Sequence, residues 1–233
     1  MTVRQSIRTL AASAFCLLAA GLTSTPALAD LCASTTNCTL TFTQGNAGSG
    51  FGSGNFGTLN LALSGNTVTV TIDLANNFFL IDTGFPGAVG FSDSLGGGLT
   101  IGNFSSAAYS GSASHATSDL HFDGFGFFND AAATTAPSAG SASAVNVLSF
   151  TVSRAGLNDV EQLLNLANPA GGDGQAYFVA DVINRNTGGP GAGSTGLIAI
   201  TGGGPPNETP EPQTLALIGL GLLGLTIMRR RAI

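Results

Sequence analysis

The chain has 233 residues, of which 43% are hydrophobic and only 9% are charged, and its formal net charge is −6. It contains no lysine, and between residues 30 and 201 its only basic side chains besides histidine are Arg154 and Arg185. An acidic surface of this kind repels nucleic-acid phosphates and anionic lipid head groups, so neither is expected as a partner.

Residues 1–29 have the pattern of a secretory signal peptide. Two arginines precede an uncharged, largely apolar segment at residues 10–22, and Ala27 and Ala29 provide the small-x-small pattern of a cleavage site. We therefore expect export across a membrane and a mature protein that begins at Asp30.

Two cysteines, Cys32 and Cys38, follow the expected cleavage site. In an exported protein, an even pair at this short spacing predicts one local disulfide. The alternative is half of a metal site, but the two histidines that could complete it, His115 and His121, are far away in the sequence.

Residues 30–201 are long enough for one domain with a hydrophobic core, and they have the pattern of short strands separated by glycine and small polar residues. The clearest signal is a hairpin: apolar and polar residues alternate over 59–63 and 68–74, on either side of a turn at 64–67. Further strands are expected at residues 39–43, 78–82, 89–91, 99–101, 120–122, 125–128, 145–152, 175–183 and 197–200. This pattern predicts an all-β fold, a single β-sandwich or jelly-roll-like domain.

Three stretches depart from the strand pattern. The glycine-dense residues 45–57 predict a loop or strand edge, and residues 131–144, rich in Ala, Ser and Thr, predict a connection. One short helix is expected after them, with Asn158 as its N-cap, Glu161 as the capping-box partner, and Pro169 as its end.

The chain ends in a linker and a tail. Residues 202–209 are rich in glycine and proline, which is typical of a flexible linker. Residues 215–228 carry no charge, and as a helix they span roughly 21 Å. This length is short for a permanent anchor, because the hydrocarbon core of a bilayer is about 30 Å thick. An ordinary C-terminal membrane anchor is the alternative interpretation. The charged and proline positions that frame the segment are Pro210, Glu211, Pro212, Arg229, Arg230 and Arg231.

This order of a Pro-Glu-Pro triplet, one apolar segment and a terminal arginine cluster at residues 210–233 resembles the PEP-CTERM sorting tail of exopolysaccharide-producing Gram-negative bacteria. The resemblance implies that a membrane transpeptidase, exosortase, recognises and cuts the tail. It implies transient anchoring in the inner membrane through the C-terminal helix, followed by release to the cell surface or extracellular matrix. The β-rich, lysine-free body is also similar to other proteins of this kind, which implies a structural or adhesive role in a biofilm, with extracellular polysaccharide as a partner.

The histidines do not form a recognisable catalytic motif. A Ser-His-Asp arrangement would have to combine a serine with His115 or His121 and with Asp119 or Asp123, but the chain has no Gly-x-Ser-x-Gly elbow. His121 lies within an alternating strand pattern, which predicts a histidine on the solvent-facing side of a sheet.

The carboxylates give equally weak signals for a metal or a catalytic pair. Asp119, Asp123 and Asp130 could supply oxygen ligands to calcium, yet the spacing of a calcium loop is absent. Asp73 and Asp82 could form a glycosidase-type pair, but surface carboxylates are the more common reason for such residues. We therefore expect no catalytic residues, no cofactor and no enzymatic activity. The alternatives are a secreted hydrolase using residues 119–130, or a calcium-dependent or glycan-binding module.

Overall fold

The structure is a computed structural model, and it describes residues 31–114, 120–168, 172–188 and 191–201. The signal peptide, the linker and the C-terminal membrane segment expected from the sequence lie outside these residues. Within these ranges no helix has the length and apolar character needed to cross a membrane.

The described residues confirm the predicted all-β class, because they contain thirteen strands, two short 3-10 turns and no α-helix. The elements are β1 (Asn37–Gly45), η1 (Ala47–Ser49), β2 (Ser53–Ser64), β3 (Thr67–Leu74), β4 (Phe78–Leu80), β5 (Val89–Phe91), β6 (Thr100–Gly102), β7 (Ser110–Ser114), β8 (Leu120–Phe122), β9 (Gly126–Phe128), β10 (Asp130–Thr135), β11 (Val147–Ser153), η2 (Val160–Leu163), β12 (Ala176–Asn184) and β13 (Thr195–Thr201).

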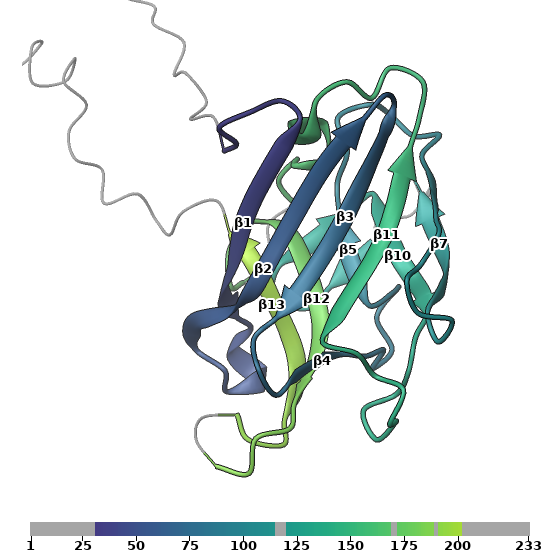
Figure 1. The fold of residues 1–233 in the computed structure, drawn as a ribbon. Helices are drawn as coiled ribbons and strands as arrows, with labels where there is room; N and C mark the ends of the chain where they lie inside the picture. Colours follow the sequence, from purple (N-terminus) through teal and green to yellow (C-terminus); the bar gives the residue numbers. More distant parts are fainter. Residues whose placement is uncertain (1–30, 115–119, 169–171, 189–190, 202–233) are drawn as a thin grey trace, which may run out of the picture. The chain divides into compact units, whose positions relative to one another are not determined.

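Eleven of the strands belong to one sheet. Its order is β6-β11-β3-β2-β1-β13-β12-β5-β10-β7, and β4 pairs with β12 beside this path. Figure 1 shows the long strands β1, β2, β3 and β11 next to one another, with β13 and β12 following β1. The two ends of the order, β6 and β7, contact each other, so the sheet is nearly closed. Strands β8 and β9 form a separate hairpin.

The predicted hairpin at residues 59–74 is formed by β2 and β3. Leu59 pairs with Ile72, and Leu61 pairs with Val70. All four side chains are buried, which explains the alternation in the sequence, since successive residues of a strand point to opposite faces. The turn places Gly65 at a φ of 59°, a left-handed conformation that glycine adopts without steric cost.

The prediction that residues 131–144 form a connection is wrong for residues 131–135, because they belong to β10, which lies between β5 and β7. Ala131, Ala132 and Ala133 are fully buried there. Ala131 belongs to the same core cluster as the rings of Phe122 and Phe128, and small side chains leave room for those rings. A strand made of alanines has no alternation of apolar and polar residues, so its sequence did not indicate a strand.

The helix predicted between the N-cap Asn158 and Pro169 is also wrong, since the described residues 158–168 contain only the 3-10 turn Val160–Leu163. Its N-cap is Asp159 and not Asn158. The Oδ1 atom of Asp159 accepts a hydrogen bond from the backbone N–H of Glu161 at 2.9 Å. The Oε1 atom of Gln162 accepts one from the backbone N–H of Asp159 at 3.1 Å. A capping box is therefore present, one residue later than predicted.

Pairing with another segment explains why this turn does not continue as a helix. Leu164 forms a parallel bridge with Ser92, and the N–H of Asn165 donates to the Ser92 carbonyl at 3.0 Å. These contacts require an extended backbone after Leu163. Tertiary hydrogen bonding thus overrides a local sequence preference for helix.

Candidate functional site

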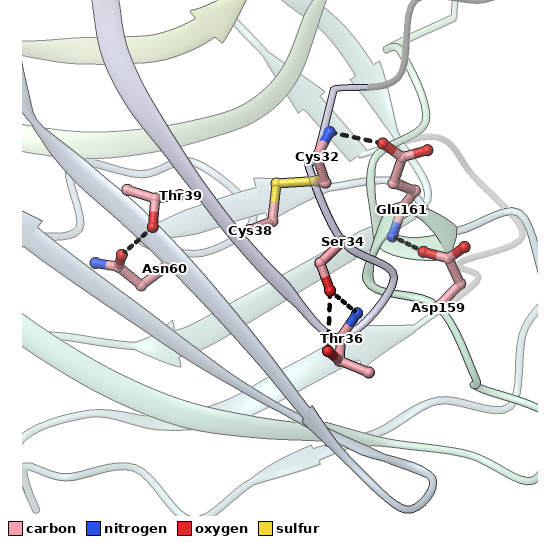
Figure 2. The surroundings of a disulfide bond; sticks show 8 residues. All are labelled: Cys32, Ser34, Thr36, Cys38, Thr39, Asn60, Asp159 and Glu161. Carbon is pink, nitrogen blue, oxygen red and sulfur yellow. Dashed lines mark hydrogen bonds between the residues drawn. A yellow bond between two sulfur atoms is a disulfide. The ribbon is translucent and has the colours of Figure 1, made fainter.

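A disulfide joins Cys32 and Cys38 near the start of the described residues, and its sulfurs are 1.95 Å apart (Figure 2). Both cysteines are buried. The backbone N–H of Cys32 donates to Oε1 of Glu161 at 2.8 Å, and the N–H of Val160 donates to the carbonyl of Thr35 at 2.9 Å. The disulfide and these hydrogen bonds fasten the start of β1 to η2. The expected cleavage residues, Ala27, Ala29 and Asp30, lie outside the described residues.

His121 lies in β8 with its side chain exposed. It pairs across the hairpin with Phe127, and the two ring centroids are 4.6 Å apart. Asp123, in the turn that follows, is exposed as well. His115 and Asp119, the other residues considered for a catalytic trio, lie outside the described residues.

Asp130, the third residue of the possible calcium group, is fully buried in β10, whereas Asp123 is exposed. The Asp130 carboxylate accepts a hydrogen bond from the backbone N–H of Asp93 at 3.3 Å. Asp93 is itself buried, and its Oδ1 accepts from the N–H of Leu95. Asp130 thus contributes to the internal bonding of this part of the fold. Across the described ranges, no group of three His, Cys, Asp or Glu side chains could hold a metal ion.

The residues considered as a glycosidase pair lie on different elements. Asp73 is exposed on β3, directly opposite Thr58 of β2. Asp82 lies after β4, where its Oδ1 caps the turn by accepting from the N–H of Gly84 at 2.8 Å. The negative charge of Asp82 acts on another carboxylate, Asp181.

Asp181 is a buried acid that the sequence analysis did not select as a site residue. It lies in the middle of β12 with no exposed surface. Its Oδ2 accepts two hydrogen bonds from Thr83, from the backbone N–H at 2.6 Å and from the hydroxyl at 2.7 Å. Burial raises the pKa of Asp181 to about 7; the bonds from Thr83 oppose this rise, and the nearby charge of Asp82 adds to it. The signal was present in the sequence, as a single acid within an otherwise apolar strand.

The outer surface of β1, β2, β3 and β11 is lined by hydroxyl and amide groups. One row crosses the four strands through Thr39, Asn60, Thr71 and Ser149, which are paired in register. The Thr39 hydroxyl donates to Asn60 Oδ1 at 2.8 Å, as Figure 2 shows, and the hydroxyls of Thr71 and Ser149 are 2.9 Å apart. This face is polar and mostly uncharged, with Asp73 as the acid on β3.

An open cavity of about 540 Å³ lies where the β2–β3 turn approaches β6 and the end of β11. It is lined by Asn66, Thr67, Gly98, Thr100, Ser153, Arg154 and Ala155. The guanidinium of Arg154 is held at its edge by a hydrogen bond from Nη1 to the carbonyl of Leu95 at 2.5 Å. The cavity therefore combines one positive charge with hydroxyl and amide groups, and the sequence analysis did not predict it.

A disulfide-bonded all-β domain, with a signal-peptide pattern before it and an apolar segment and arginines after it, has the organisation of an exported protein sorted by its C-terminal tail. The family model of the PEP-CTERM protein-sorting motif matches residues 208–231. The chain therefore carries this motif, which confirms the resemblance seen in the tail. The motif implies export, processing by exosortase, and sorting to the cell surface or extracellular space. Comparisons with curated protein sequences and with solved structures gave no match.

Proposed function

We propose that this protein is a structural or adhesive component of the cell surface or extracellular matrix in a biofilm rich in exopolysaccharide. The observation that carries the proposal is the PEP-CTERM motif at residues 208–231, which follows a single all-β domain. In this proposal the tail anchors the chain only transiently in the inner membrane, and exosortase then releases the domain.

We infer that the domain acts through its surface and not as an enzyme. The positions of the candidate residues support this inference, because His121 is exposed beside Phe127 while Asp130 is buried in β10. Asp73 and Asp82 likewise lie on separate elements. A secreted hydrolase would instead need several catalytic groups, such as an acid and a base or a nucleophile and a base, close together at one substrate-binding site.

The proposed fold is a sandwich-like packing of the nearly closed sheet around one interior. Buried side chains from both flanks support this packing: Leu59, Ile72 and Phe150 come from β2, β3 and β11, and Phe178 and Ile198 come from β12 and β13. Such a domain presents a rigid polar outer face. Hydroxyl and amide groups on that face can both donate and accept hydrogen bonds, which suits contacts with an extracellular polysaccharide.

Cell fractionation of the native organism tests the proposal. The protein is expected in the surface or matrix fraction, and removal of the polysaccharide layer is expected to release it into the medium. The matched variant replaces Arg229, Arg230 and Arg231 by alanine, and it should accumulate in the inner-membrane fraction or be lost from the surface. If the wild-type protein remained in the periplasm, the matrix role would be wrong.

A further inference from the structure

The distribution of positive charge in the domain is unusual and singles out the cavity. Arg154 and Arg185 are the only Lys or Arg residues between residues 30 and 201. The guanidinium of Arg185 already interacts with two groups of the domain. It lies over the ring of Phe79, 4.4 Å from the centroid, and it donates a hydrogen bond to the Ser141 carbonyl at 2.5 Å. Arg154 lines an open cavity instead.

The guanidinium of Arg154 retains capacity for an external anion. It has five N–H donors in a planar fork. Within the described part of the chain, its hydrogen-bond partner is the neutral carbonyl of Leu95. That bond fixes the position of the side chain without neutralising its charge. A carboxylate is a natural ligand for such a group, because it accepts two parallel hydrogen bonds from the fork.

The rest of the lining fits a polyhydroxylated molecule. Thr67 pairs with Ser153, and Ser153 pairs with Thr100, so three hydroxyl side chains form one row across β3, β11 and β6. All three line the cavity together with the amide of Asn66. With neighbouring strands about 4.8 Å apart, this row extends over roughly 10 Å. Each hydroxyl can donate and accept, which matches the mixed donors and acceptors of sugar hydroxyl groups.

We propose that this cavity, with Arg154 at its edge, binds a sugar that carries a carboxylate, such as a uronic acid residue of a polysaccharide. Arg154 binds the carboxylate, and Thr67, Thr100, Ser153 and Asn66 bind the hydroxyl groups of the same or the adjacent sugar. The site is continuous with the hydroxyl-bearing face of β3 and β11, along which a polysaccharide chain can extend.

The overall charge distinguishes this ligand from other anions. The domain is acidic, so at Arg154 a carboxylate, with one negative charge, is repelled less than a phosphate monoester, which carries about −1.5 to −2 at pH 7. A neutral sugar would leave the charge of Arg154 unused. The inference rests on the surface role proposed above, since a matrix polysaccharide is the source of such a sugar outside the cell.

Binding is measured by isothermal titration of the full-length protein, kept in mild detergent, with tri-galacturonate as the probe. The neutral trisaccharide maltotriose and the free anions acetate and sulfate are the comparison ligands. Arg154→Gln is expected to weaken tri-galacturonate binding by about tenfold or more, because a charge-assisted hydrogen bond is lost. Thr100→Val, which retains shape and removes a hydroxyl, is expected to weaken it less. The matched control, Arg185→Gln, should bind as the wild type does.

The outcomes separate the inference from its alternatives. Equal binding of maltotriose, equal competition by acetate or sulfate, or wild-type binding by a folded Arg154→Gln protein would overturn it. If Arg154→Gln did not fold, unchanged binding by both Thr100→Val and Ser153→Ala would overturn it. Failure of binding by a protein that reaches the cell surface rejects only this site. A protein that binds tri-galacturonate but stays inside the cell rejects the matrix role instead.

Discussion

The buried carboxyl of Asp181 makes the stability of the domain depend on pH in an unusual direction. In the folded domain its side chain has no exposed surface, and its Oδ2 is bound twice by Thr83. Among the described residues, its Oδ1 has no hydrogen-bond partner. Desolvation of the charged form is therefore the largest effect on its pKa, which rises from 3.8 to about 7.

The direction and size of this pH dependence follow from the linkage between proton binding at Asp181 and folding. Between these two pKa values the folded domain holds a proton on Asp181, whereas the unfolded chain has released it. Each pH unit in this window then lowers the free energy of unfolding by about 1.4 kcal/mol, so the contribution of this group falls by about 4 kcal/mol between pH 4 and pH 7. It is fully present below the unfolded pKa and is lost as the pH rises through the folded pKa.

Asp181→Asn tests this reasoning because the amide has nearly the shape of the protonated acid and cannot ionise. Urea unfolding of both proteins at several values between pH 4 and pH 8 gives the two free energies. We expect the variant to gain up to about 4 kcal/mol relative to the wild type as the pH rises through this window. Asp73→Asn, at an exposed position on β3, is the control and should show no comparable gain. Parallel pH profiles for wild type and Asp181→Asn would refute the argument.

Four further substitutions test the packing. Ile72→Asp should prevent folding, as judged by circular dichroism, because it places a charge in a fully buried position. His121→Ala should change the free energy of unfolding by less than about 1 kcal/mol, since that side chain is exposed. Gly90→Ala should lower stability in a thermal melt by about 1–3 kcal/mol, because a Cβ there would lie 2.5 Å from the ring of Phe122. Cys38→Ser should cost at most a few kcal/mol, as the closed loop is short. The packing described above would be contradicted if the Ile72→Asp protein folded or if the Gly90→Ala protein were as stable as the wild type. It would also be contradicted if either the His121→Ala or the Cys38→Ser protein could not fold.

The long strands could be predicted from the sequence because their burial follows a simple period. In β2 and β3, every second residue faces the interior, and the Gly65 turn fixes the register. The nearly continuous apolar run of β12 reflects a strand that is buried along most of its length. These signals are local, so a single sequence contains them.

The features that were missed depend on contacts between distant segments. The alanines of β10 are in a strand because they pair with β5 and β7, and Ala131 packs in the same buried cluster as Phe122. The helix expected near residue 160 is shortened by the bridge between Leu164 and Ser92. The cavity joins the loops around Asn66, Gly98 and Arg154, which are far apart in sequence. No local pattern reports such a juxtaposition.

The sorting tail, by contrast, could be predicted from the sequence, because the motif is defined by the order of a few residues along the chain. Pro210 and Glu211, the apolar segment and the arginines are readable without a fold, and the family match covers them. The tail thus indicates where the protein is sorted, whereas it gives no information on the activity of the domain.

The most direct test is to determine both ends of the native protein, recovered from the cell surface, by mass spectrometry. We predict an amino terminus at Asp30 and the absence of residues 215–233, because the signal-peptide pattern and the short apolar tail are both expected to be removed during export. Recovery of an intact C-terminal peptide from surface-located protein would contradict sorting by cleavage of the tail.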